Sequence, residues 1–262
     1  MDSDRVLRLE GVHNFRDYGG YPVNGGGRLK RGVLWRSGQH HGATEADLER
    51  IAALSLASVF DLRSSKERSS HPCRRPAGFA ATVHIPEDPQ HIRDAPHVAA
   101  AATTKQRDAA STRESLRRNY HTIAFRPELI GAMRRYLAEL AEGKGPSLIN
   151  CMAGKDRTGI AVAMLHLATG VHRDDVIADY LLTNSAGDVE ARIAAGADTI
   201  RAMSGDLDDE VLRVLMGVEA EYLETALDKI VERHGSVESY LSEVLGADEG
   251  LRDKLRAALV EA

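Results

Sequence analysis

The chain has 262 residues, of which 43% are hydrophobic and 28% are charged, and its formal net charge is −5. This length and composition are sufficient for one well-buried domain, while the acidic balance argues against a general nucleic-acid binder. The two cysteines, Cys73 and Cys151, are too few for a disulfide framework and suit a reducing compartment.

The sequence predicts neither a signal peptide nor a membrane span. Residues 1–5 lead to no apolar core of adequate length for a signal peptide. The longest apolar stretch, residues 160–168, is far shorter than the roughly 20 residues that cross a bilayer. We therefore expect a cytoplasmic protein.

The first predicted elements are a helix and two strands. Thr44 is a typical helix N-cap, and Asp47, three residues later, completes an approximate capping box. Residues 57–60 and 81–85 are apolar runs typical of buried strands.

Two helical segments separate these strands from the middle of the chain. Residues 98–125 are polar yet rich in helix-forming residues, so they predict either a helical lid over a pocket or a solvated connecting helix. A more apolar helix is predicted for residues 127–141.

A third strand, at residues 147–150, leads directly into the most informative segment. It is followed by Cys151 and then by an apolar helix at residues 160–168, so the cysteine lies in a strand-to-helix loop. Such a loop gathers backbone N–H groups at the positive end of a helix dipole, which is a binding site for an oxyanion. The three strands and the helices between them predict an α/β fold with a central, mostly parallel sheet flanked by helices.

The last part of the chain is helical and acidic. Apolar residues recur at helical spacing in three stretches, which Gly235 and Gly246 separate. We expect the helices of residues 205–262 to pack on the sheet, within a single domain that spans residues 1–262.

The side chains of the loop suit nucleophilic attack on a phosphate. A cysteine at a helix N-terminus beside cations has a pKa below its usual value of about 8.5, so Cys151 is expected to be a nucleophilic thiolate. Arg157 carries a planar fork of donors that matches two phosphate oxygens, and Lys155 adds a second positive charge. The Thr158 hydroxyl can donate to the sulfur as it leaves phosphorus.

Two glycines give this loop its shape. Gly154 permits backbone conformations and a close approach that a side chain would block, and Gly159 lets the following helix pack tightly. A buried cysteine with only a packing role is the alternative interpretation of Cys151. The combination of Gly154, Arg157, Thr158 and Gly159 at the required spacing favours catalysis.

Residues 151–158 resemble the phosphate-binding loop of the protein tyrosine phosphatase superfamily, which is Cys, any five residues, Arg, and Ser or Thr. The version Gly-Lys-Asp-Arg-Thr-Gly is similar to the atypical bacterial and fungal branch of tyrosine and phosphoinositide phosphatases. Further stretches resemble that branch in order and spacing: residues 14–20 (NFRDYGG), 32–38 (GVLWRSG), 60–64 (FDLRS) with 67–68, and 179–184 (DYLLTN). The resemblance spans about residues 10–260.

The resemblance implies a tyrosine-phosphatase-like fold and a cysteine-dependent phosphatase. Its substrates would be phosphotyrosine, and also phosphoserine, phosphothreonine or phosphoinositides, and it would release inorganic phosphate from a phosphocysteine intermediate. The transition state would be held by Arg157 and by the backbone of Met152, Ala153, Gly154 and Lys155. The family usually has His before the cysteine, whereas this chain has Asn150, which can hydrogen-bond but cannot carry charge.

The leaving group needs a proton from a carboxylic acid. The resembling branch implies that Asp156, inside the loop, is this acid. Many tyrosine phosphatases keep the acid on a separate upstream loop instead, which makes Asp88 and Glu87 alternatives. Asp61 is a further candidate, as an acid or as a substrate-binding residue; it could equally be the ion-pair partner of an arginine such as Arg63.

Two other classes of function are weighed against a phosphatase. Asn150 raises the possibility of a phosphate-binding module without catalysis. Sulfur transfer and arsenate reduction also use a cysteine in an anion-binding loop. The nucleophile, Arg157 and Thr158 occurring together favour the phosphatase. The eleven histidines lack the spacing of a zinc site, so we predict no metal and no cofactor.

Overall fold

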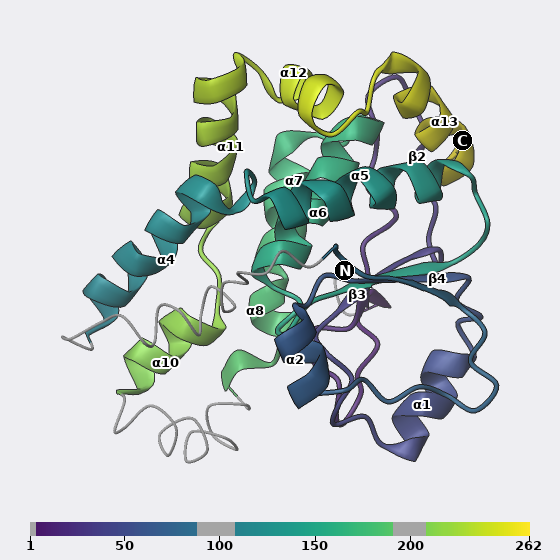
Figure 1. Ribbon diagram of the computed structural model, residues 1–262, viewed down its shortest axis with the longest axis vertical. Coiled ribbons are helices and arrows are strands. Elements are labelled where there is room, and N and C mark those ends of the chain that lie inside the picture. Colours follow the sequence, from purple (N-terminus) through teal and green to yellow (C-terminus); the bar gives the residue numbers. More distant parts are fainter. Residues whose placement is uncertain (1–3, 88–107, 191–207) are drawn as a thin grey trace.

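The computed structural model describes residues 4–87, 108–190 and 208–262, and within them it shows an α/β fold (Figure 1). A mixed sheet has the strand order β1-β3-β6-β4-β5, and a separate ribbon pairs β2 with β7. The strands are β1 (Arg16–Asp17), β2 (Arg28–Leu29), β3 (Leu34–Ser37), β4 (Ser58–Asp61), β5 (Thr82–His84), β6 (Ser147–Asn150) and β7 (Val260–Glu261). The predicted fold class is confirmed.

Helices cover both faces of the sheet. Those before residue 190 are α1 (Glu45–Ala52), α2 (Ser65–Ser70), α4 (Ala109–Ile123), α5 (Pro127–Ala141), α6 (Asp156–Thr169), α7 (Arg173–Leu181) and α8 (Thr183–Ala186). Those after residue 207 are α10 (Asp209–Met216), α11 (Ala220–His234), α12 (Val237–Ser239), the π-helical turn η2 (Tyr240–Val244) and α13 (Glu249–Leu259).

The strand order places the cysteine at the centre of the sheet. β6 runs parallel to both of its neighbours, β3 and β4. In this register Asn150 lies opposite Ser37 on one side and opposite Asp61 on the other. The three strands therefore end together, and the segments that follow them meet at the edge where open α/β sheets bind ligands.

The alternation of side chains along the central strands fills two separate cores. Val59 and Leu148 point to the face covered by α1, where they pack with Leu48 and Ile51. Phe60 and Ile149, one residue further along each strand, point to the opposite face and pack in the larger core with α5 and α6. Both sides of the central strands are therefore buried, as their apolar sequence predicts.

Local sequence signals set two helix boundaries correctly. Thr44 caps α1, and the predicted capping box with Asp47 is present in both directions. The helix predicted for residues 127–141 has those bounds in α5, with Pro127 in its first turn, where a proline removes no intrahelical hydrogen bond.

Strand β5 differs from its prediction as a buried strand. It is shorter than expected, and Val83 retains 42% of its side-chain exposure. Among the described residues, β5 is the last strand in the sheet order and pairs only with β4. An apolar run does not distinguish a central strand from an edge strand, because the number of strands that pair with it depends on the arrangement of the whole sheet.

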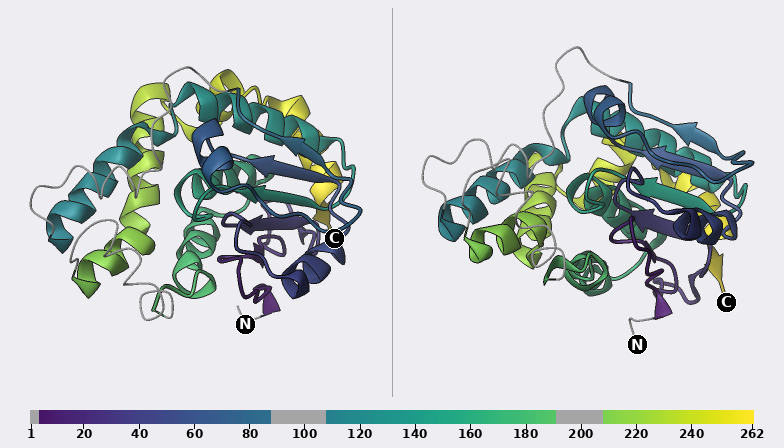
Figure 2. Two further views of the ribbon diagram at one scale, coloured as in Figure 1. Left: turned by 60° about the horizontal axis from the view of Figure 1, so that its bottom comes forward. Right: turned by 90° about the horizontal axis from the view of Figure 1, so that it is seen from below.

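The contacts of the C-terminal helices are largely with other helices, and their packing on the sheet stays a prediction. α10 and α11 pack against α4, and α13 packs against α5 and α6. In Figures 1 and 2, α4, α10 and α11 stand together to one side of the sheet. The apolar faces of these helices are buried by other helices. Residues 98–107, part of the predicted lid, lie outside the described residues, and the remainder forms helix α4, which has one buried face, and the start of its connection to α5.

Candidate active site

The segment between β6 and α6 forms a compact loop around Cys151. The cysteine is 3% exposed and the Arg157 side chain lies in the first turn of α6. Lys155 is the N-cap residue of α6, so the loop ends at the positive pole of a helix of 14 residues. The predicted strand-to-helix placement of Cys151 is therefore confirmed, and the binding of an anion in this loop stays a prediction.

The surrounding scaffold turns the carbonyl groups of the loop outward. The backbone N–H of Gln39 donates to the carbonyl of Met152 over 3.0 Å. The Asn14 side-chain amide donates to the carbonyls of Ala153, over 3.3 Å, and Gly154, over 2.7 Å. In a trans peptide the N–H is opposite to the C=O. The next N–H groups along the chain therefore point away from this scaffold, as an anion-binding loop requires.

Buried charges hold this scaffold in place. Arg36 donates to the carbonyl of Gly154 over 3.0 Å and to Oδ2 of Asp179 over 2.6 Å. Arg16 donates to Oδ1 of Asp179 over 3.4 Å and also to Asn14. Burial alone would raise the pKa of Asp179, but the charges of Arg16 and Arg36 lower it to about 2. The motifs at residues 14–20, 32–38 and 179–184 thus supply one ionic cluster beneath the loop.

Both loop glycines are required by contacts. Gly154 has a φ of +65°, and a Cβ there would lie 2.4 Å from the backbone of Ser37. A Cβ on Gly159 would lie 2.9 Å from the ring of Tyr180. Only a glycine at position 154 lets the loop approach β3 this closely, and only a glycine at position 159 lets α6 approach α7 this closely.

Glu67 fixes the guanidinium of Arg157. Its two carboxylate oxygens each accept from one terminal nitrogen of Arg157, both over 2.7 Å, and the Leu62 carbonyl accepts from one of them. Burial alone would lower the pKa of Arg157, but the hydrogen bonds that it donates to Glu67 and the charge of Cys151 outweigh burial and raise the pKa. Glu67 belongs to one of the stretches that carry the resemblance, but the sequence assigned it no role. Its capping box with Ser64 indicates the start of α2, but not the pairing with an arginine 90 residues away.

Two polar atoms at the base of the loop are buried without a partner among the described residues: Nε of Arg157 and Oγ1 of Thr158. Buried donors are normally satisfied, and exceptions occur at sites that bind a further group. An oxyanion can accept from Arg157, and the sulfur of Cys151 can accept from Thr158, as the sequence predicted.

Asp156 and Lys155 face the outer helices. Asp156 is 2% exposed, and its Oδ1 accepts from the Tyr120 hydroxyl of α4 over 2.6 Å. The Lys155 ammonium is also buried, donates to the carbonyl of Leu215 in α10 over 2.7 Å and lies 3.8 Å from Oδ1 of Asp156. Lys155 therefore contributes its charge from inside the protein. This buried placement does not correspond to a cation at an open pocket mouth.

Asp61 lies beneath the loop and is engaged by neighbouring residues. Its carboxylate forms a paired contact with Arg63, over 2.8 and 2.7 Å, and accepts from the Asn150 side chain over 3.2 Å. Of its possible roles, the ion pair with Arg63 is the one that these contacts favour. Asn150 is the neutral donor to Asp61, and its Oδ1 has no partner within the described residues.

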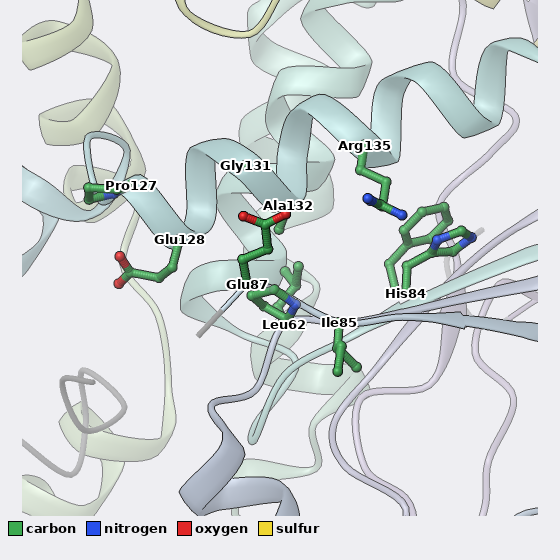
Figure 3. A pocket seen from close by; sticks show the side chains of 11 residues that line it. Leu62, His84, Ile85, Glu87, Pro127, Glu128, Gly131, Ala132 and Arg135 are labelled. Carbon is green, nitrogen blue, oxygen red and sulfur yellow. The ribbon is translucent and has the colours of Figure 1, made fainter. Parts of the chain in front are cut away.

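The alternative acid Glu87 lies in a different place. It lines a cavity of about 440 Å³ between α5 and the ends of β4 and β5, together with Leu62 and Arg135 (Figure 3). Cys151 and Arg157 are not among the residues that line this cavity. Asp88 lies outside the described residues. Of the predicted acids, the structure brings Asp156 into the loop of Cys151.

The described parts of the chain contain no cluster of three or more His, Cys, Asp or Glu residues arranged to hold a metal ion. In the same residues, no helix combines the length and the apolar character that a membrane crossing requires.

The fold and the site define a cysteine-based phosphatase of the α/β class. A profile described as the tyrosine phosphatase family matches residues 7–261. The Mycobacterium tuberculosis protein named triple specificity protein phosphatase PtpB is 31% identical over 97% of this chain and 99% of its own length. A Cupriavidus necator protein, provisionally named as a tyrosine-protein phosphatase, is 32% identical over 92% of this chain and 85% of its own length. The chain belongs to the tyrosine phosphatase family, which confirms the predicted class of enzyme and its need for a phosphorylated substrate.

Proposed function

We propose that Cys151 attacks the phosphorus of a phosphate monoester while Asp156 protonates the leaving oxygen. Water then hydrolyses the phosphocysteine, with Asp156 taking a proton from the water. The bond broken first joins phosphorus to the leaving oxygen, and the second step returns the thiolate and releases inorganic phosphate. The observation that supports this most is the outward anchoring of the carbonyls of Met152, Ala153 and Gly154, which turns the following N–H groups away from the scaffold and makes them available to an anion.

Arg157 and the loop N–H groups are proposed to hold the equatorial oxygens of the transition state. The paired contact with Glu67 fixes one edge of the guanidinium, so its orientation is set before substrate binds. The unpartnered Nε is then a donor for phosphate. Thr158 is proposed to donate to the sulfur as phosphorus leaves it.

The proposed substrates are phosphotyrosine together with phosphoserine and phosphothreonine, and phosphoinositides. The basis for a range wider than phosphotyrosine is the relative named triple specificity protein phosphatase, which aligns over nearly the whole chain. Hydrolysis rates on phosphotyrosine, phosphoserine and phosphothreonine peptides of one sequence, and on short-chain phosphoinositides, test this range. Turnover of phosphotyrosine peptide alone would contradict it.

The nucleophile is tested by hydrolysis of para-nitrophenyl phosphate by wild type, Cys151→Ser and Cys73→Ser. Cys73 is the matched control because its sulfur accepts from the His40 N–H, which a serine oxygen can also do. We expect Cys151→Ser to lose about 10³-fold or more of kcat, because a serine hydroxyl without a base is a poor nucleophile, and Cys73→Ser to stay within about twofold of wild type.

Vanadate competition separates catalysis from binding in the same experiment. Inhibition of wild type by vanadate with loss of turnover in Cys151→Ser supports the thiolate mechanism. An inactive wild-type protein that still binds vanadate would instead support the phosphate-binding module suggested by Asn150.

A further inference from the structure

Helix α4 carries a buried phenol to the carboxyl group of Asp156. The Tyr120 hydroxyl donates to Oδ1 of Asp156 over 2.6 Å, and the Tyr180 hydroxyl lies 2.7 Å from that of Tyr120. Tyr120, Tyr180 and Asp156 are each at most 2% exposed. We propose that Tyr120 is a positioning residue that holds Oδ1 of Asp156 and directs the transferred proton to Oδ2. This rests on the proposed role of Asp156 as the acid.

The direction of the hydrogen bonds follows from the carboxylate. An ionised carboxyl group only accepts, so Tyr120 donates to it, and Tyr180 then donates to the oxygen of Tyr120. Burial, and next the charge of Asp156, raise the pKa of Tyr120, and the same two causes raise the pKa of Tyr180. Both hydroxyl groups therefore keep their protons at neutral pH and remain donors.

The position of Lys155 supports the same oxygen assignment. Its ammonium lies 3.8 Å from Oδ1, the oxygen that Tyr120 also contacts. A proton on Oδ1 would face both a hydroxyl hydrogen and a positive charge, whereas a proton on Oδ2 leaves Oδ1 as an acceptor. The Tyr120 bond therefore persists whether Asp156 is protonated or ionised.

This persistence suits both steps of the reaction. In the first step the proton on Oδ2 passes to the leaving oxygen, and the electron pair of the broken bond to phosphorus becomes the lone pair that accepts it. In the second step Oδ2 takes a proton from the attacking water. Tyr120 donates to Oδ1 throughout, so the carboxyl group keeps one orientation through both proton transfers.

The outer helices hold Tyr120 rigidly. The ring of Tyr222, on α11, stacks on the ring of Tyr120 with centroids 5.5 Å apart, and Tyr180, on α7, meets it edge-on at 6.4 Å. Leu116 and Ile123 bury the adjoining face of α4. The helix expected to be a lid or a solvated connection is therefore the support of the acid, with its phenol fixed by two neighbouring helices.

The test compares Tyr120→Phe with Tyr136→Phe, both with wild type. Tyr136 is the matched control because it is equally buried and its hydroxyl bonds to Tyr18, away from Asp156. Each variant is measured on phenyl phosphate, a poor leaving group, and para-nitrophenyl phosphate, a good one. We expect Tyr120→Phe to lower kcat about tenfold on phenyl phosphate and less than about twofold on para-nitrophenyl phosphate, with KM unchanged, because general-acid catalysis contributes about 10²–10⁴-fold and positioning accounts for part of it.

The pH profile adds a readout that a purely structural role would not move. In Tyr120→Phe no hydroxyl donates to Oδ1 of Asp156, so the ionised carboxylate loses a hydrogen bond that stabilises it. The basic limb of the kcat profile should therefore move to higher pH. Tyr136→Phe should keep the wild-type profile and the wild-type dependence on leaving group. A Tyr120→Phe protein that matches Tyr136→Phe in both measurements overturns the proposal.

Tyr180→Phe serves as the second variant should Tyr120→Phe fail to fold. It removes the donor to Tyr120 and leaves the contact with Asp156, so it should change the same two measurements in the same direction, with a decrease in kcat on phenyl phosphate of about threefold. An unchanged Tyr180→Phe, with Tyr120→Phe unfolded, also overturns the proposal.

Asp156→Ala separates this inference from the proposed function. If Asp156→Ala shows no leaving-group dependence, the acid itself is misassigned and the proposed function fails at that residue. If Asp156→Ala shows the dependence and Tyr120→Phe does not, only the role of Tyr120 fails.

Discussion

The two sides of the phosphate-binding loop are held by different chemistry. On the side of the sheet, the charged groups of Arg16, Arg36 and Asp179 form a buried ionic cluster that anchors the backbone. On the side of the outer helices, the neutral hydroxyl of Tyr120 donates to the carboxyl group that is proposed to exchange a proton, and the Tyr180 hydroxyl bonds to that of Tyr120.

This difference corresponds to what each side must do. The carbonyls on the sheet side have one correct orientation, and a buried cluster in which two arginines share one aspartate keeps them there. The helical side must accommodate Asp156 in two protonation states, and a phenol can donate to either. Changes on the sheet side should therefore affect stability first, and changes on the helical side should affect proton transfer first.

The largest effect is expected from Asp179→Asn. This change leaves Arg16 and Arg36 buried beside a neutral amide, and breaking a buried pair in this way costs about 3–5 kcal/mol. Denaturant unfolding measures the loss. The control is Asp253→Asn, whose pair with Arg256 is exposed and is expected to contribute under about 0.5 kcal/mol. Equal effects of the two changes would contradict the importance of the buried cluster.

Gly154→Ala should follow in size. A left-handed conformation costs an alanine about 1–2 kcal/mol, and overlap with the Ser37 backbone adds about 1 kcal/mol or more. Because the new methyl group would displace the loop N–H groups, kcat should fall by about 10²-fold. Gly25→Ala is the matched control, since its φ is +92° but nothing lies within 4 Å of its Cβ. A kcat as high as that of Gly25→Ala would mean that the loop tolerates the shift.

Mild acid should weaken the sheet side before the carboxyl groups titrate. Burial lowers the pKa of His40 from 6.5 to about 3, so below pH 6.5 the unfolded chain gains a proton that the folded chain does not. The free energy of unfolding should therefore fall as pH falls from 6.5 to 5, by up to about 1.4 kcal/mol per pH unit from this group. Burial also lowers the pKa of His166, which adds to the same trend.

Denaturant unfolding at several pH values measures this slope. His40→Gln should flatten it. If His40→Gln does not alter this slope, the acid sensitivity of the folded protein arises from groups other than His40. The contribution of Asp179 is fully present above pH 3.8 and is lost only as the pH falls towards 2, so it lies outside this window.

The smallest effect on stability is expected from Tyr120→Phe. Loss of one hydrogen bond to Asp156 should cost about 1–2 kcal/mol, similar to Tyr136→Phe, although the two variants differ in leaving-group dependence. Thermal unfolding of both proteins checks the comparison. A loss as large as that of Asp179→Asn would show that the helical side also holds the fold together.

The sequence by itself determined the features that depend on neighbouring residues. The strand, loop and helix around Cys151, the cap of α1 and the bounds of α5 follow from patterns within about 15 residues, and the family membership follows from motifs read in order. The need for Gly154 and Gly159 was also predicted, because a close approach of the loop and α6 to neighbouring elements requires glycine whichever elements those are.

Only the tertiary structure decided which distant side chains meet. It paired Glu67 with Arg157 and Tyr120 with Asp156, and it engaged Asp61 with Arg63. It also placed β5 at the edge of the sheet and packed the C-terminal helices against other helices. The physical reason is common to all of these. Periodicity and capping report which face of an element is apolar and where it ends, whereas the choice of partner depends on how all the elements are arranged in space.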